Sequence, residues 1–149
     1  MDVKGMWQRL DRGTRIYALV LLAGALLWVG WALYEDPQVA ALNRRLDADP
    51  VVSAFPYRFR VLRLERGVAT MSTPRSSAVP VARVLGILFP EVAGRAETSA
   101  AYLDAQQRLA RVQTRARDLV LEAPGVERVA WALDRTWLER HGVVLAPAY

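Results

Sequence analysis

Four arginines, placed among aromatic and aliphatic residues, are the side chains in this sequence whose types and spacing most clearly suggest chemistry. Arg58, Arg60, Arg63 and Arg66 fall in and directly after the segment YRFRVLRLE. The guanidinium fork matches phosphate oxygens. Strand alternation places Arg58 and Arg60 on one face, whereas Arg63 falls on the other face unless a bulge or the strand end intervenes. The segment therefore predicts a surface for lipid headgroups or a protein partner, with a solvated face that protects a sheet edge as the alternative.

Residues for catalysis or metal binding are sparse. Cysteine is absent, and the only histidine is His141. A general base needs a nucleophile beside it, and no serine stands in a G-x-S-x-G pattern. Asp47 and Asp49 are two residues apart, so a helix would not place them on one face, and capping and solubility explain them better. We therefore expect a non-enzyme without catalytic residues, cofactor or metal, in which His141 interacts with a helix dipole.

An uncharged run from Ile16 to Leu33 is the most apolar part of the chain. About 17–25 apolar residues cross the hydrocarbon core of a bilayer, which is about 30 Å thick. With Tyr34 included, the run predicts one transmembrane helix over residues 16–34. Aromatic residues favour the headgroup layers, and small residues let helices approach closely. The expected anchor residues are Tyr17, Gly24, Trp28, Trp31 and Tyr34.

The flanks of this run predict its orientation. Residues 1–15 are basic, whereas Glu35 and Asp36 follow the run. The positive-inside rule then places residues 1–15 in the cytoplasm and residues 35–149 in the periplasm of a bacterium, anchored in the inner membrane. The bulky WALYED sequence does not suggest a cleavage site. The expected partners are membrane lipids and other integral membrane or periplasmic proteins, and no nucleic acid is expected outside the cytoplasm.

Residues 35–149 predict a small α+β domain. An apolar stripe favours a helix over 37–49, and a second, longer stripe favours one from about Ser99 to Glu122. Gly67 is a turn signal between two strands, 57–65 and 68–74. A third strand is expected over 126–134, and shorter helices over 81–89 and 135–141. The expected architecture is αββ(α)αβ, a three-stranded sheet packed against helices.

This order of elements resembles the BON domain, a small αββαβ module of bacterial envelope proteins. The residues that carry the resemblance are the segment LDADP at 46–50, the turn glycine Gly67, and the segment PGVERV at 124–129. The sequence departs from the family where its second hairpin glycine is Thr73, and where AVPVARVLGILFPEVAGRAE is inserted before the long helix. The resemblance implies an envelope location, attachment to phospholipid membranes or envelope proteins, and no catalysis.

Together these features predict a membrane-anchored, non-catalytic binding or scaffold protein. Its expected role is that of an accessory subunit or assembly factor of a larger membrane or envelope complex. A membrane-tethered phospholipid-binding module, which would use the four arginines, is the alternative. A tethered hydrolase is the least favoured hypothesis.

Overall fold

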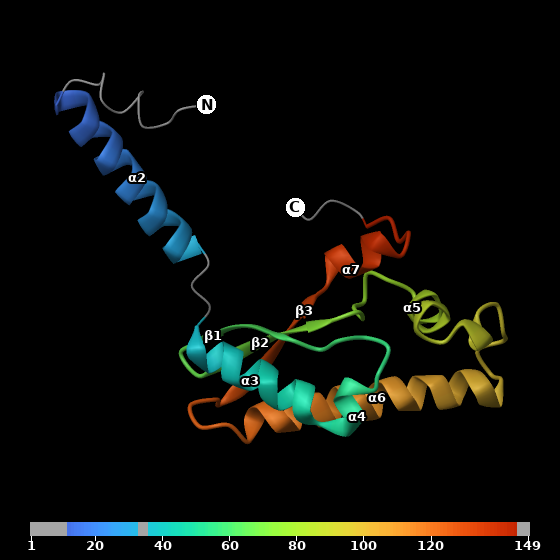
Figure 1. The fold of residues 1–149 in the computed structure, drawn as a ribbon. Helices are drawn as coiled ribbons and strands as arrows, with labels where there is room; N and C mark the ends of the chain where they lie inside the picture. Colours follow the sequence, from blue (N-terminus) through green and yellow to red (C-terminus); the bar gives the residue numbers. More distant parts are fainter. Residues whose placement is uncertain (1–11, 33–35, 146–149) are drawn as a thin grey trace. The chain divides into compact units, whose positions relative to one another are not determined.

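The structure is a computed structural model that describes residues 12–32 and 36–145. Its contacts divide the chain into two units, residues 1–35 and residues 36–149. Each unit is described by itself below (Figure 1).

The first unit contains one described helix, α2 (Arg12–Ala32). The predicted transmembrane helix over 16–34 is wrong, because no helix among the described residues is both long and apolar enough to cross a bilayer. The uncharged part of α2 begins at Ile16 and its described end is Ala32. At 1.5 Å per residue this part is about 25 Å long, which is less than the hydrocarbon thickness of about 30 Å. Residues 33–34 of the predicted span lie outside the described residues.

The second unit opens with helix α3 (Pro37–Ala48), which begins where capping residues predict it. The carboxylate of Asp36 accepts a hydrogen bond from the backbone N–H of Gln38 at 2.8 Å. Proline at the first helical position costs no hydrogen bond there. The apolar stripe Val39, Leu42 and Leu46 is buried. A short helix, α4 (Pro50–Ser53), follows directly.

Strands β1 (Val61–Glu65) and β2 (Val68–Thr73) form an antiparallel hairpin. Arg66 and Gly67, with φ angles of 48° and 76°, connect them. Two successive residues with positive φ are typical of a type I′ turn, whose twist matches that of the strands. The first strand was expected to begin at Tyr57, but it begins four residues later, because Tyr57 lies in a bend and residues 58–60 have no regular structure. The carbonyl of Arg60 accepts the N–H of Ser72 at 2.8 Å just before the strand begins.

Two helices and a 3₁₀ turn connect the hairpin to the last strand. They are α5 (Val81–Leu88), η1 (Pro90–Val92) and α6 (Ala100–Leu121). The hydroxyl of Ser99 caps α6 by accepting from the N–H of Tyr102 at 3.3 Å. Strand β3 (Arg128–Leu133) and helix α7 (Arg135–Arg140) complete the described part of the unit.

The strand order in the sheet is β1-β2-β3. Strand β3 runs parallel to β2, so the sheet is mixed. Helices α3, α4 and α6 lie together along one side of the sheet, and α7 lies at the far end of β3 (Figure 1). One core cluster joins these elements, and its largest fully buried side chains include Tyr57, Phe59, Met71 and Leu109. The second unit is therefore an α+β fold with a three-stranded mixed sheet and helices.

Candidate functional site

A β-bulge determines where the predicted arginine surface lies. Val61 pairs with Met71, but Arg63 pairs with Thr70, so that Leu62 is the extra residue. Val61 and Met71 are buried in the core. The bulge therefore turns Arg63 to the solvent face, where Arg60 also lies, and prevents it from entering the core.

Two of the four arginines already have polar partners within the chain. Arg58 donates to both carboxylate oxygens of Asp47, at 3.1 and 2.7 Å. This hydrogen-bonded contact is the main reason why the pKa of Asp47 lies below its usual value. Arg63 donates to the hydroxyl of Thr70 at 3.3 Å and lies 3.9 Å from Glu65.

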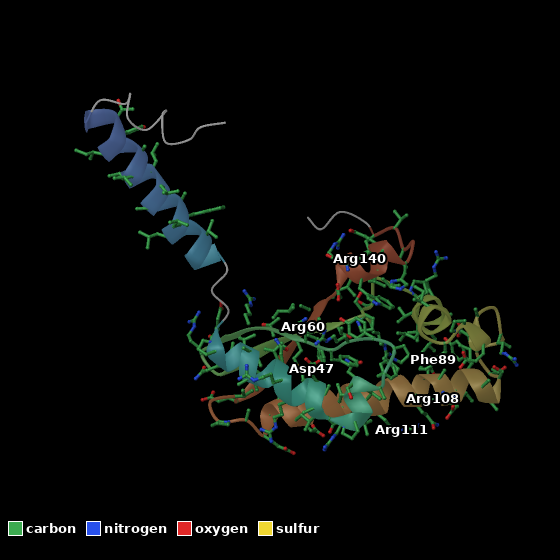
Figure 2. All side chains as sticks on the ribbon, in the orientation of Figure 1. Asp47, Arg60, Phe89, Arg108, Arg111 and Arg140 are labelled. Carbon is green, nitrogen blue, oxygen red and sulfur yellow. The ribbon has the colours of Figure 1, made fainter. Side chains whose placement is uncertain are left out.

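No hydrogen bond or ion pair joins the guanidinium group of Arg60 or Arg66 to another described residue. The backbone N–H of Arg60 donates to the hydroxyl of Ser72 at 3.1 Å, and its carbonyl accepts from the N–H of Ser72 at 2.8 Å. The charge of Arg60 also helps to lower the pKa of Asp47, and both residues are labelled in Figure 2. With Asp47 and Glu65 beside it, the four-arginine surface has a smaller excess of positive charge than the sequence suggests. Glu65 stands in the same segment as the arginines, but the sequence could not show the pairing with Asp47, which lies eleven residues before Arg58 on another element.

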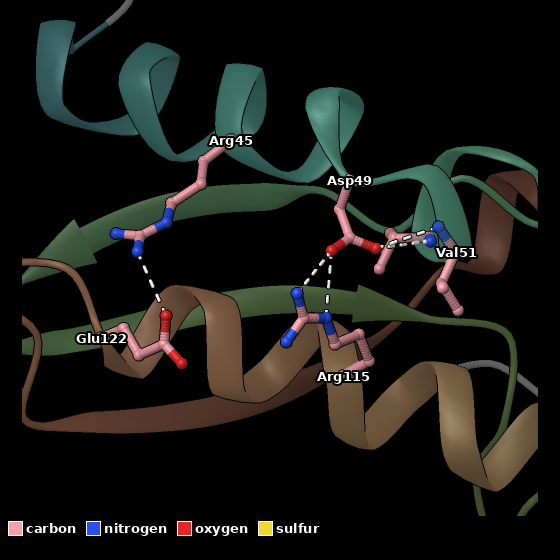
Figure 3. A network of polar contacts seen from close by, with 6 residues as sticks. Arg45, Asp49, Val51, Arg115 and Glu122 are labelled. Atoms are coloured by element: carbon pink, nitrogen blue, oxygen red, sulfur yellow. Dashed lines mark hydrogen bonds and ion pairs between the residues drawn. The ribbon is translucent and has the colours of Figure 1, made fainter.

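A second polar network holds α3 and α4 against α6 (Figure 3). The buried carboxylate of Asp49 accepts from the backbone N–H groups of Val51 and Val52, both at 3.0 Å. It also accepts two bonds from Arg115, at 3.0 and 2.8 Å. Arg45 pairs with Glu122 at 3.1 Å near the end of α6. The expectation that Asp49 is a capping residue is confirmed, and its ion pair with α6 is an additional feature.

The outer edge of β1 is closed by a side chain of α3. The buried amide of Asn43 donates to the carbonyl of Val61 at 3.0 Å and accepts from its N–H at 2.8 Å. This pair of bonds replaces a neighbouring strand at that point. Together with the bulge and the arginines, it protects the edge against pairing with another chain.

The opposite edge of the sheet, along β3, is open among the described residues. Two backbone groups of this segment point toward β2. The N–H of Arg128 donates to the carbonyl of Gly67 at 3.1 Å, and the N–H of Asp134 donates to the carbonyl of Thr73 at 2.8 Å. Backbone groups alternate along a strand, so the N–H and C=O groups of Val129, Trp131 and Leu133 point away from β2.

Two hollows adjoin the open edge at Trp131. Their volumes are about 560 and 230 Å³, and both are lined by Arg75, Gln113 and Trp131. The smaller hollow is also lined by Ala110 and Thr114 of α6. A half-buried tryptophan beside open space and unpaired backbone is typical of a binding surface. From the sequence, Trp131 could be an interface anchor but is more readily a core residue, because only the strand order shows that β3 lies outermost.

The structure places His141 where a structural role is sufficient. It ends α7, and its Nδ1 lies 2.8 Å from the carbonyl oxygen of Trp137. Its ring packs on the indole of Trp137, with ring centroids 4.3 Å apart. Among residues 12–32 and 36–145, no group of three or more potential ligands could hold a metal ion.

The predicted anchor residues are placed by the structure only in part. On α2, Tyr17 and Trp28 are exposed to 66% and 67%. Gly24 has open space where a Cβ would lie. Trp31 belongs to α2, whereas Tyr34 lies outside the described residues.

No protein-family model matches this chain, and no significant similarity to a curated protein or to a solved structure was found. The resemblance to the BON domain therefore stays a prediction. The cellular location predicted from the flanks of the apolar run also stays a prediction.

Proposed function

We propose that this chain is a non-catalytic accessory subunit or assembly factor, which joins a membrane complex through the apolar surface of α2 and presents the second unit as a binding domain. One observation carries the proposal: the large apolar side chains of α2 are exposed along the helix. Leu19 is 55% exposed, Leu22 54% and Leu27 76%. Contiguous apolar surface of this kind is typical of sites that contact a membrane or another protein.

The second unit supports the same proposal because it buries a core of its own. Leu46, Met71 and Leu109 are all at most 1% exposed within one cluster that joins helices and sheet. Lipid hydrocarbon would favour the exposed apolar side chains of α2 over water by about 25 cal/mol per Å² of surface.

Flotation of the full chain with vesicles of neutral phosphatidylcholine tests the proposal. The test variant carries three polar substitutions on α2, Leu19→Ser, Leu22→Ser and Leu26→Ser. The fraction of this variant that floats with the vesicles should be at least tenfold lower than that of the unchanged chain. The control exchanges two leucines that are exposed on the second unit, Leu62→Ser and Leu103→Ser. Equal flotation of both variants would contradict the role of α2.

Binding of phospholipid headgroups by the arginine surface is the second candidate function. The observation that favours it is the bulge, which places Arg63 on the solvent face with Arg60. Anionic vesicles should then bind the chain more strongly than neutral ones, and salt should weaken that binding. The test variant is Arg60→Gln, Arg63→Gln and Arg66→Gln, and it should bind anionic and neutral vesicles equally. The control carries the same change at three arginines of α6 and α7, Arg111→Gln, Arg117→Gln and Arg140→Gln, and it should keep the preference for anionic vesicles.

A further inference from the structure

The open edge of β3 has a sequence that is complementary to itself. Around Trp131 the segment reads Glu-Arg-Val-Ala-Trp-Ala-Leu-Asp-Arg, from 127 to 135. If a second copy runs antiparallel with Trp131 opposite Trp131, Arg128 faces Asp134 of the copy. We propose that two copies of this chain pair through β3 in this register, so that their sheets join into one.

The backbone supports this register. Val129, Trp131 and Leu133 carry the outward N–H and C=O groups. In the proposed register Val129 faces Leu133 of the copy, so every outward group of the three residues meets an outward group of the partner strand. An unpaired edge of this kind is a template for another strand.

Side-chain sizes support it as well. Ala130 faces Ala132 of the copy in a pair without direct hydrogen bonds, where side chains of neighbouring strands come closest. Methyl groups fit there without displacing the backbone. Trp131 lies on the two-fold axis beside the smaller hollow, whose volume is about 230 Å³ and whose lining includes Ala110 and Thr114 of α6. This hollow gives space for the second indole, and a central tryptophan is a frequent hot spot of interfaces.

Charge selects this register over its neighbours. A shift by two residues in one direction places Arg128 opposite Ala132, and a shift in the other direction places it beyond the end of β3, where α7 begins. In both cases the attraction between Arg128 and Asp134 is lost. Arg128 is exposed, whereas the carboxylate of Asp134 is fixed by bonds from the N–H of Trp137 at 2.9 Å and the hydroxyl of Tyr57 at 3.1 Å. Opposite charges directly across a strand pair are stabilising. The contact is isologous, so it closes as a dimer.

The absence of cysteine from the sequence allows a test of the register by crosslinking. Full-length chains with Ala130→Cys or Ala132→Cys would be purified in mild detergent, mixed, and oxidised. A disulfide that joins one Ala130→Cys chain to one Ala132→Cys chain is expected to predominate at least tenfold over disulfides between like chains. The two variants alone are the matched controls, because their cysteines lie diagonally across the pair.

A charge variant tests the same register without cysteine. Arg128→Glu should place a second negative charge opposite Asp134 of the copy, once on each side of the two-fold axis. The dissociation constant of the dimer, measured by sedimentation equilibrium, should rise about tenfold. Arg111→Glu, an equal charge change at an exposed site of α6, is the control and should leave the dimer unchanged. Circular dichroism verifies that each variant is folded.

The outcomes separate this proposal from association through α2. A dimer that Arg128→Glu leaves intact, or that links like cysteine variants as readily as the mixture, would overturn the pairing through β3. A chain that stays monomeric would overturn it too. None of these three results affects vesicle binding, which tests the proposed role of α2 separately.

Discussion

Asp49 is the residue at which one substitution has the clearest predicted effect on folding. Asp49 ends α3 with its backbone N–H, which donates to the carbonyl of Leu46. Its carboxylate caps α4 by accepting two backbone bonds, and it accepts two more bonds from Arg115 of α6. Asp49 is only 8% exposed, so water compensates poorly for a lost partner. Removal of the carboxylate therefore removes a cap and a link between elements that are 66 residues apart in sequence.

The size of the effect follows from these two contributions. Loss of an aspartate cap costs about 1 kcal/mol. The ion pair adds about 1 kcal/mol, because Arg115 is half exposed and its charge is partly screened by solvent. Asp49→Ala should therefore lower the free energy of unfolding by about 2 kcal/mol. Asp49→Asn keeps a good cap and should lower it by about 1 kcal/mol.

Urea unfolding of the full chain in mild detergent, followed by circular dichroism, measures both values. The control is Asp104→Asn on the exposed face of α6, where the pair with Arg108 is worth about 0.3–0.5 kcal/mol. If Asp49→Ala costs no more than this control, the assignment of Asp49 as a structural link is refuted. A double-mutant cycle with Arg115→Gln should give a coupling of about 1 kcal/mol.

The pH dependence of stability offers an independent measurement on the same carboxylate. Burial raises the pKa of Asp49, but the bonds from Val52, Arg115 and Val51 outweigh burial and leave the pKa below its usual value. A lowered folded-state pKa gives stability that is fully present above the unfolded-state value of about 3.9, and that is lost as the pH falls through the folded-state value. In Asp49→Asn this part of the acid destabilisation should disappear.

Three further substitutions test other parts of the fold. Asn43→Ala should cost about 2–4 kcal/mol, because it leaves the buried N–H and C=O of Val61 without partners, and hydrogen exchange at the Val61 amide should accelerate. Gly67→Ala should cost at least about 1 kcal/mol in urea unfolding, since φ is +76° and a Cβ would lie 3.0 Å from the side chain of Glu127. Burial raises the pKa of Tyr57, so its contribution to stability is present below the unfolded-state value of about 10 and is lost as the pH rises above it. Alkaline unfolding should therefore shift to higher pH in Tyr57→Phe, and an unchanged midpoint would contradict this.

The helices and strands of the second unit were largely predictable because their signals are local. A capping aspartate followed by proline predicted the start of α3, and the apolar stripe of Tyr102, Leu109 and Ala116 predicted α6. Gly67 predicted the hairpin turn for the same reason, since only the local backbone conformation is involved. The membrane span over 16–34 was predicted from hydropathy alone, and it is wrong because no helix among the described residues is both long and apolar enough to cross a bilayer.

The candidate surfaces were less predictable, because they depend on which elements become neighbours. Alternation alone could not decide the face of Arg63, which the bulge at Leu62 determines. Likewise, the pairing of Arg58 with Asp47 requires the packing of α3 against the approach to β1. The charge pattern from 127 to 135 was visible in the sequence, but it gains meaning only once β3 is known to be an edge.

The two edges of this sheet differ in a way that strand propensity does not explain. On β1 the chain uses the amide of Asn43, a bulge and exposed arginines, each of which hinders pairing with another strand. On β3 the residues from Val129 to Leu133 include no charge and no proline, and the charges stand only at the two ends in complementary order. A chain that protects one edge by several features and leaves the other apolar has an edge suited to a partner, and the partner whose charges match is its own copy.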